Sequence, residues 1–413
     1  MFSLGLGYKW WGSGGTPLAV MPSQLTLTRA QAGGAMSTAQ ASDNVTWVEY
    51  AADVARFHGT AQRLLIGGQR TNSVRNPRAE GSTPTNWVIQ LGAGVTVTYV
   101  GGGRANGIDF AAYEIAGTPS VTTGGFINFE TVSGIAAAPG EIWTSSAFIA
   151  LDPDFANNTA GTNFDMRVFS VGGGDAVGSV FTPTTATLSS QRVATTRTMP
   201  ASTDAMQPRL RIGVSIGVPV LFRLRIGWPQ AEQAAFASNP ILPPVGTPGA
   251  STRGSDLVSA TLASLGLNIP CTILWCGMIP QNASAGADQM LCQIDDGSDN
   301  NRYRIRNLAG GSTIVAGRVL AGASADATSL GSMTAGTLFR AGVSIDAAGR
   351  IAGSFNGGTV QAATGGPASG LTTLRLGNNA ANSAAQFGEN KTLIVVPLAL
   401  SDAELVAQVA ALT

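Results

Sequence analysis

The chain has 413 residues, of which 44% are hydrophobic and 12% are charged, and its formal net charge is zero. The length suits two domains with an extension, and the apolar content is sufficient for a folded core. A neutral chain does not offer the basic surface that nucleic-acid binding normally requires, so we expect no nucleic-acid partner.

The first residues form a glycine-rich segment that contains two adjacent tryptophans, Trp10 and Trp11. This segment lacks the continuous apolar region and the early basic region of a signal peptide. The longest strongly apolar run, Leu393 to Leu400, is too short to cross a bilayer. We therefore expect synthesis in the cytoplasm and no membrane insertion. The two tryptophans are candidates for docking to a partner, with packing against the following domain as an equal alternative.

Period-2 alternation of apolar and polar residues recurs over residues 76–240 and predicts short strands. Every second residue from Val218 to Trp228 is apolar, and the preceding stretch from Leu210 to Ile216 alternates in the same way. Gly217 lies between these two stretches, so they are candidates for a hairpin. Many short strands separated by Gly, Pro, Asn and Ser predict a jelly-roll sandwich over residues 76–240, after an attachment and lead-in region over residues 1–75.

A Pro- and Gly-rich segment separates this first strand series from a second one. Residues 241–254 have the composition of an extended linker. After it, residues 255–413 again alternate, and the turn from Asp346 to Gly349 predicts a hairpin between the apolar stretches on either side of it. The second series therefore predicts another sandwich over residues 255–413.

One helix is expected, at the end of the chain. Ser401 is followed three residues later by Glu404, which is the pattern of a capping box. Leu405, Val409 and Leu412 then share one face at helical spacing. The sequence predicts a short terminal helix that packs this face against the second sandwich.

The composition offers little for catalysis or for a metal site. The chain has a single histidine, His58, whereas nucleophilic triads and general-base chemistry usually require this residue type. The three cysteines have no zinc-ligand spacing and apolar neighbours, which indicates buried free thiols. Carboxylates such as Glu114, Glu130 and Asp165 have no recognisable glycosidase context. We expect no catalytic residues, no cofactor and no metal.

The densest acidic group is formed by Asp295, Asp296 and Asp299. Clustered carboxylates in a loop can hold Ca²⁺ through oxygen ligands. The same residue types also favour a hairpin turn for backbone reasons, and the spacing departs from that of an EF-hand loop. The turn is favoured, and calcium binding remains the alternative.

Several segments resemble the proteins of phage tail and head fibres. The resemblance covers most of the chain thinly and rests on the order and spacing of its segments, which are Leu27–Ala30, Arg63–Asn72 followed by Asn86 and Trp87, Ile226–Ser238 running on to Asp256, and Leu398–Leu405. The second and third resemble the entry to and exit from a carbohydrate-binding-module-like domain. The last resembles the close of a concanavalin- or laminin-G-like domain. The resemblance implies surface attachment and glycan recognition.

Glycan binding requires aromatic platforms together with amide and guanidinium groups for the sugar hydroxyls. Trp143 and Trp228 lie on apolar strand faces, which favours a place in the core. Tyr303 adjoins a polar loop and is flanked by arginines, so we expect it to be more open. Tyr303 and Arg304 are therefore the candidate carbohydrate-binding residues.

Together, these observations predict a non-catalytic fibre, spike or baseplate component of a tailed phage or gene-transfer-like particle. Its expected partners are other virion proteins, reached through Trp10 and Trp11, and host-surface polysaccharide. Its expected location is the virion surface. The low charge and the resemblance to fibres also favour a homotrimer. The alternatives are a polysaccharide depolymerase and a purely structural capsid or tail decoration protein.

Overall fold

Strands dominate the computed structural model, which describes residues 21, 23–90, 92–122 and 125–412. Strand accounts for 47% and helix for 4%, which confirms the predicted all-β class. The strands form two compact units, each with two facing antiparallel sheets, as expected for β-sandwiches. No helix in the described ranges is long and apolar enough to cross a membrane.

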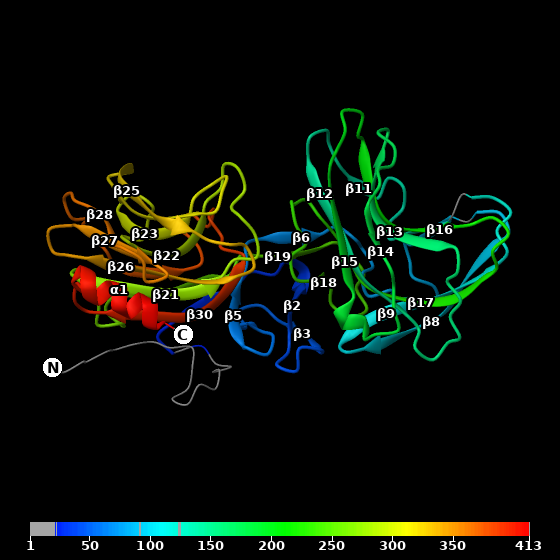
Figure 1. Ribbon diagram of the computed structural model, residues 1–413, viewed down its shortest axis with the longest axis horizontal. Coiled ribbons are helices and arrows are strands. Elements are labelled where there is room, and N and C mark those ends of the chain that lie inside the picture. The colour runs from blue at the N-terminus through cyan, green and yellow to red at the C-terminus, as the bar shows by residue number, and fades with distance from the viewer. Residues whose placement is uncertain (1–20, 22, 91, 123–124, 413) are drawn as a thin grey trace. The chain divides into compact units, whose positions relative to one another are not determined.

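Unit 1 contains residues 53–69 and 254–413 together with the described part of residues 1–30. Its first sheet, the β22 sheet, has the order β1 (Thr26–Thr28), β20 (Leu257–Thr261), β29 (Thr373–Leu376), β22 (Gln289–Asp295), β23 (Arg302–Asn307), β24 (Thr313–Leu320), β25 (Ala323–Ser332). Its second sheet, the β21 sheet, has the order β28 (Gln361–Ala363), β27 (Ile351–Phe355), β26 (Leu338–Ile345), β21 (Cys271–Met278), β30 (Gly388–Val396), β5 (Arg63–Ile66), β4 (Phe57–His58). Figure 1 shows the two sheets as separate layers.

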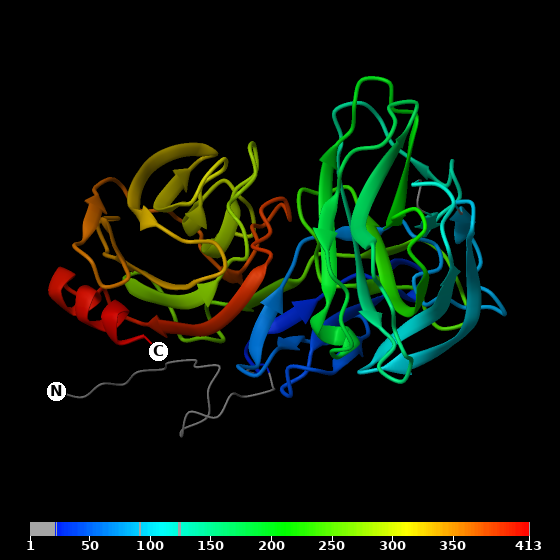
Figure 2. The same cartoon turned by 45° about the vertical axis from the view of Figure 1, so that its right-hand side comes forward.

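Unit 2 contains residues 31–52 and 70–253. Its β16 sheet has the order β14 (Ser179–Phe181), β13 (Thr162–Val171), β16 (Ala205–Val214), β10 (Gly125–Asn128), β7 (Val88–Gln90), and β11 (Ile135–Ala136) also pairs with β16. Its β17 sheet has the order β15 (Arg192–Thr198), β12 (Ile142–Leu151), β17 (Val220–Glu232), β9 (Ile108–Gly117), β8 (Val95–Ala105). Figure 2 shows these layers from a second direction.

Short elements complete unit 2. Two small sheets are formed by β18 (Ile241–Leu242), β2 (Met36–Gln40) and β3 (Trp47–Tyr50), and by β19 (Ser251–Arg253) and β6 (Arg70–Asn72). Two 3₁₀ turns, η1 (Ala32–Gly34) and η2 (Leu188–Ser190), lie in its connections.

The alternation that predicts the strands also determines which side chains form each core. In unit 1, Trp275 of β21 and Ile305 of β23 belong to one buried cluster that fills the space between the two sheets. In unit 2, Leu210 of β16 and Phe222 of β17 do the same. The apolar residues on alternate positions therefore face the partner sheet, as the pleat of a strand requires.

The two predicted hairpins have different outcomes. The strands on either side of the turn from Asp346 to Gly349, β26 and β27, pair antiparallel and confirm the first. The hairpin around Gly217 is wrong, because β16 and β17 belong to different sheets of unit 2. The apolar faces of β16 and β17 both contribute to one core, so the chain crosses from one sheet to the other at this turn.

The predicted terminal helix is present as α1 (Asp402–Ala411). The Ser401 side chain accepts from the backbone N–H of Glu404, and the Glu404 side chain accepts from the backbone N–H of Ser401, so the capping box is complete. Leu405, Val409 and Leu412 are buried in a cluster with residues of β21 and β27. The helix thus covers the outer face of the β21 sheet (Figure 1).

The boundaries of the units differ from those expected. The described part of residues 1–75 is not a separate region, because β1, β4 and β5 belong to the sheets of unit 1 and β2, β3 and β6 to those of unit 2. Residues 241–254 do not form a free linker either, since β18 and β19 pair there with β2 and β6. Leu64 and Ile66 are both fully buried, so these early residues form part of the hydrophobic core of unit 1.

A buried charge network holds together the three pieces of chain that make up unit 1. The Asp256 carboxylate accepts from Arg29 Nη1 at 2.6 Å, from Arg56 Nη2 at 2.5 Å and from the backbone N–H of Gly67 at 2.7 Å. The side chains of Arg29, Arg56 and Asp256 are all fully buried. Buried charges of this kind require partners with good geometry, and here one carboxylate serves two guanidiniums.

Replacing Asp256 by Asn should strongly destabilise the chain. The change leaves two buried guanidiniums without their carboxylate, which costs about 3–5 kcal/mol of unfolding free energy. Urea denaturation would measure the loss. The matched control is Asp402→Asn, because Asp402 pairs with Arg350 at 2.8 Å in an exposed position, and it should cost about 1 kcal/mol or less. Equal losses in the two variants would contradict the central role of Asp256.

Candidate functional site

The two candidate glycan-binding residues, Tyr303 and Arg304, are neighbours on β23 and therefore point to opposite faces of the sheet. Tyr303 points inward, is 1% exposed, and belongs to the core of unit 1. Its hydroxyl accepts from the backbone N–H of Ala368 at 3.1 Å. The expectation that Tyr303 is open is wrong, because the alternation of the strand outweighs the polar loop beside it.

Arg304 lies on the outer face of the β22 sheet, in a row with Arg302 and Arg306 at alternate positions of the same strand. Each of these two neighbours has a carboxylate partner. Arg302 pairs with Asp299, and Arg306 pairs with Asp288. Arg375 lies two strands away on β29, across β22 from Arg304, and pairs with Asp295 at 2.7 Å.

Arg304 differs from these neighbours because it has no carboxylate of its own. It is 8% exposed, and within the described ranges its guanidinium has no hydrogen bond or ion pair. Its cross-strand neighbours are Gln293 and Gly317, and the glycine adds no side chain to the face. Burial, followed by the nearby charges of Arg306 and Arg302, lowers the pKa of Arg304 to about 10. At neutral pH it is therefore still a cation, and the nearby carboxylates of Asp288 and Asp299 compensate its charge only in part.

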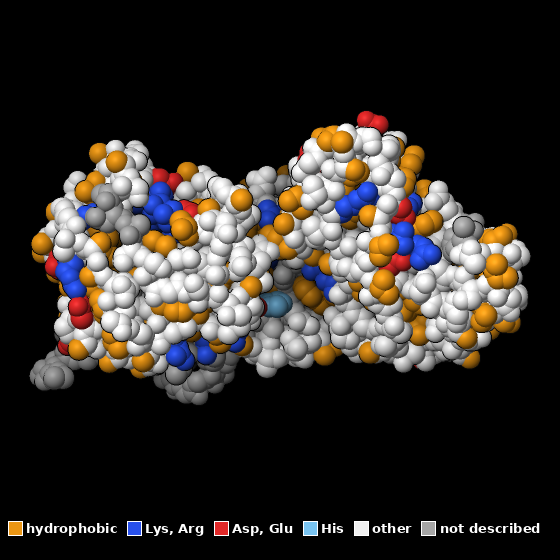
Figure 3. All heavy atoms as spheres, turned by 45° about the horizontal axis from the view of Figure 1, so that its top comes forward, with side chains coloured by type: hydrophobic (Ala, Val, Ile, Leu, Met, Phe, Trp, Pro, Cys, Tyr) orange, Lys and Arg blue, Asp and Glu red, His pale blue; other side chains and the backbone are white. Residues whose placement is uncertain are grey.

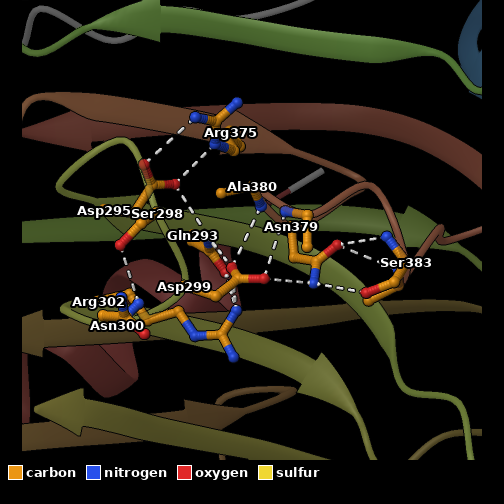
Figure 4. Close-up of polar contacts among 12 residues, drawn as sticks. Gln293, Asp295, Ser298, Asp299, Asn300, Arg302, Arg375, Asn379, Ala380 and Ser383 are labelled. Carbon is orange, nitrogen blue, oxygen red and sulfur yellow. Dashed lines mark hydrogen bonds and ion pairs between the residues drawn. The ribbon is translucent and has the colours of Figure 1, made fainter. Parts of the chain in front are cut away.

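The acidic turn between β22 and β23 supplies two of the carboxylates (Figure 4). The Asp295 carboxylate accepts from Arg375 Nε at 2.7 Å and from the backbone N–H of Gly297 at 2.8 Å. Asp299 accepts from Arg302, from Asn379 Nδ2 at 2.7 Å and from the backbone N–H of Ala380 at 3.2 Å. The turn thus anchors the loop after β29 to the arginine row.

The same turn was the alternative candidate for calcium. Asp296 accepts from the side chain and backbone of Ser298 and from Asn301, and the Ser298 hydroxyl first of all lowers the pKa of Asp296. The carboxylates of this turn are therefore engaged by protein donors, as in a turn organised by Asp and Ser side chains. No group of three or more His, Cys, Asp or Glu side chains suited to a metal ion occurs in the part of the chain that the structure describes.

A second polar face lies on the outer side of the β16 sheet in unit 2. Arg209 of β16 has its guanidinium between two phenylalanine rings, 4.0 Å from the centroid of Phe126 on β10 and 4.1 Å from that of Phe169 on β13. Both rings are half-buried, so part of each stays at the surface. We call this region, together with the ion pairs around it, the arginine–phenylalanine face.

The ion pairs of this face join three arginines to two carboxylates. Asp175 pairs with Arg209 at 2.6 Å and with Arg167 at 2.7 Å, whereas Asp165 pairs with Arg167 and with Arg211 at 3.2 Å. The alternation of arginines with Leu210 and Ile212 is visible in the sequence. Their meeting with Phe126 and Phe169 depends on strand pairing, which the sequence does not reveal.

The space-filling view agrees with this pattern of small mixed groups. Figure 3 shows basic and acidic side chains beside one another on the visible face, with no continuous basic field. Of the other residues considered for carbohydrate, Trp143 and Trp228 are buried in the core, which confirms their predicted place. Trp10 and Trp11 lie outside the described residues.

The remaining titratable candidates are engaged in ion pairs. Glu130 pairs with Arg75 at 2.6 Å and Glu114 with Arg223 at 2.9 Å, while His58 Nδ1 lies 2.7 Å from Glu389 Oε1. The three cysteines are buried free thiols, as predicted, and burial raises the pKa of Cys271 and Cys292 to about 12.

Comparison with known proteins identifies no family for this chain. No protein-family model and no curated protein matches it. Among solved structures, the CBM40 module of the Ruminococcus gnavus IT-sialidase bound to α2,3-sialyllactose has a TM-score of 0.30 and 15% identity, and the match covers 36% of this chain and 86% of that one. A heptameric SAP-like pentraxin from Limulus polyphemus has a TM-score of 0.28 and 15% identity over 34% and 69% of the two chains.

A third solved structure matches over a longer range. The tandem CBM22 domains of Paenibacillus barcinonensis Xyn10C have a TM-score of 0.26 and 11% identity, with 81% of this chain and 99% of that one covered. The class of the present chain follows from its own sheets: it is an all-β protein of two sandwich units.

Substitutions at Tyr303 should affect stability and not ligand binding. Tyr303→Ala removes a buried ring and should lower the unfolding free energy by about 3–5 kcal/mol. Tyr303→Phe removes only the hydrogen bond from Ala368 and should cost about 1 kcal/mol. Thermal denaturation would measure both. A Tyr303→Phe variant with unchanged stability but weakened glycan binding would restore Tyr303 as a sugar contact.

Proposed function

We propose that this chain is a non-catalytic adhesive protein on the surface of a tailed phage or phage-like particle, and that it binds host-surface polysaccharide. The arginine–phenylalanine face carries the glycan part of this proposal. Sugar rings stack on aromatic side chains through their apolar faces, and their hydroxyls bond to charged and amide groups. This face combines both kinds of group on one flat sheet.

The geometry of the face favours a saccharide over an apolar partner. Phe126 and Phe169 each contact the Arg209 guanidinium and are half-buried, so the exposed parts of the two rings are the platforms available to a sugar. Arg167 and Arg211 border these platforms and are fixed by Asp165 and Asp175. Such prearranged polar groups lose little entropy when they bind hydroxyls, which is the condition for useful affinity.

The virion part of the proposal is supported by the resemblance of several segments to phage tail and head fibre proteins. Under this proposal the chain is a fibre, spike or baseplate component, its further partners are other virion proteins, and it assembles as a homotrimer. Docking to the particle is assigned to the first residues, which contain Trp10 and Trp11, because adjacent large apolar side chains gain most from burial in a partner.

Removing one ring of the arginine–phenylalanine face should weaken binding to purified host-surface polysaccharide. We expect Phe126→Ala and Phe169→Ala each to raise the dissociation constant about tenfold, which corresponds to ~1.4 kcal/mol. Isothermal titration with the purified polysaccharide measures the effect. Phe155→Ala is the matched control, because Phe155 also stacks on an arginine, Arg223, at 4.4 Å but is not part of this face.

The outcomes separate the proposal from its alternatives. Equal losses in Phe155→Ala and in the two face variants would show a general effect of aromatic removal and contradict the assigned face. Release of reducing ends during incubation with the polysaccharide would instead favour a depolymerase. Normal adsorption of particles that lack the chain would favour a decoration protein.

Deletion of residues 1–22 should abolish incorporation into particles and leave the protein folded. The reason is that the described strands begin at Thr26, so every strand that the structure describes lies outside the deleted segment. Circular dichroism would check the fold, and immunodetection on purified particles would check incorporation. Trp10→Ala with Trp11→Ala should reproduce the loss if the two rings are the anchors. A truncated chain that still assembles would contradict the docking role.

A further inference from the structure

The most conspicuous charge without a partner in the described residues is the guanidinium of Arg304. It is buried on the outer face of the β22 sheet between two other arginines of the same strand, and its Nε has no acceptor. Burying a cation without a counter-charge is costly, and two like charges beside it increase that cost. A site of this kind is stabilised when an anion enters it.

The carboxylates nearby cannot supply that counter-charge without giving up other contacts. Asp299 is held by Arg302, Asn379 and two backbone N–H groups of the loop after β29. Asp288 pairs with Arg306 and also accepts from the backbone N–H of Ala309 at 3.0 Å. Gln293, the cross-strand neighbour of Arg304, directs its oxygen to Arg302 at 3.0 Å and its nitrogen to Asp295 and Asp299.

The chemistry of the groups around Arg304 suits a small oxyanion. On the other side of the row stands Gly317, which contributes no side chain to the face. A guanidinium presents several N–H donors in a planar fork that matches the two oxygens of a carboxylate or of a sulfate group. Arg302 and Arg306 are already fixed by their aspartates, so they border Arg304 without having to move.

We infer that Arg304 binds a carboxylate or sulfate group of an acidic glycan. This inference rests on the proposed function for the class of ligand, and it adds to it a second contact site, on unit 1, and a preference for charged sugars. The ion pairs around Arg304 hold the other arginines of the row in place. The oxyanion that binds supplies the counter-charge of Arg304. A neutral sugar would leave the guanidinium uncompensated.

The test compares acidic and neutral oligosaccharides on the full chain. Isothermal titration uses three probes: an oligogalacturonate, a dextran sulfate oligosaccharide and a neutral dextran oligosaccharide. Each probe is titrated into wild type, Arg304→Gln and Arg304→Lys. The matched control is Arg340→Gln, because Arg340 is a partly exposed arginine on β26, in the other sheet of unit 1. The first two probes distinguish a carboxylate from a sulfate as the bound group.

We expect the wild type to bind at least one acidic probe about tenfold or more tightly than the neutral one, with the difference lost in Arg304→Gln and kept in Arg340→Gln. Arg304→Lys should lose most of it, because an ammonium cannot form the planar fork. Arg304→Gln should melt at an equal or higher temperature than wild type, since it removes an uncompensated buried charge.

Three other results would contradict the inference, and one of them would also contradict the proposed glycan binding. If Arg304→Gln keeps the preference for the acidic probe, the inference is wrong. If wild type binds neutral and acidic probes equally, the inference is wrong while the proposed glycan binding stands. If no oligosaccharide binds but sodium sulfate raises the melting temperature of wild type more than that of Arg304→Gln, at matched ionic strength, then both glycan assignments fail and only an anion site remains.

Discussion

The buried carboxylate of Asp256 is the contact on which unit 1 depends, because three stretches of chain that are far apart in sequence meet at it. Arg29 comes from the first stretch, Arg56 and the backbone of Gly67 from the second, and Asp256 itself begins the third. Arg29 also donates to the carbonyl of Val54 at 2.8 Å. Each stretch contributes strands to the sheets, so the network fixes the ends of strands that must pair in register.

The segments in which we expect a resemblance to fibre proteins contain several residues of this framework. Arg29, Gly67 and Asp256 all fall within the segments that carry the resemblance. Glu232 falls in another such segment, where it is fully buried and accepts from Gln230, at 2.6 Å, and from Ser238. These residues satisfy buried polar groups at strand ends, and none of them belongs to the arginine row or to the arginine–phenylalanine face. The expected resemblance therefore lies in framework segments, apart from the proposed ligand contacts.

The sequence reveals the features that depend on local order along the chain. Alternation predicts the strands, and the Ser401–Glu404 pair predicts the helix start, because both follow from spacing alone. The division into units was not accessible, since β5 pairs with β30 across more than three hundred residues. Tyr303 shows a different kind of error: it alternates with arginines and shares its face with Ile305, which indicates burial, but the prediction followed the polar loop beside it. Arg304 was identified together with it because the two are adjacent, although they face opposite ways.

On the outer faces of both units, arginines outnumber the carboxylates beside them. The two faces differ in how the excess positive charge is compensated. On unit 2, Arg167, Arg209 and Arg211 share the carboxylates of Asp165 and Asp175, which leaves one guanidinium in excess. There the excess charge is partly compensated by the faces of Phe126 and Phe169, since a cation over an aromatic ring is stabilised by the ring's electrons.

On unit 1, four arginines stand beside three aspartates, because Arg302, Arg306 and Arg375 each have a partner and Arg304 has none in the described chain. No aromatic ring stacks on Arg304 among the contacts of the described residues, and the carboxylates of Asp288 and Asp299 compensate its charge only in part. In a chain with so few charged residues, a buried arginine without a counter-charge lowers the stability of the free protein. Such a cost is expected where a side chain is retained for a ligand and not for the fold.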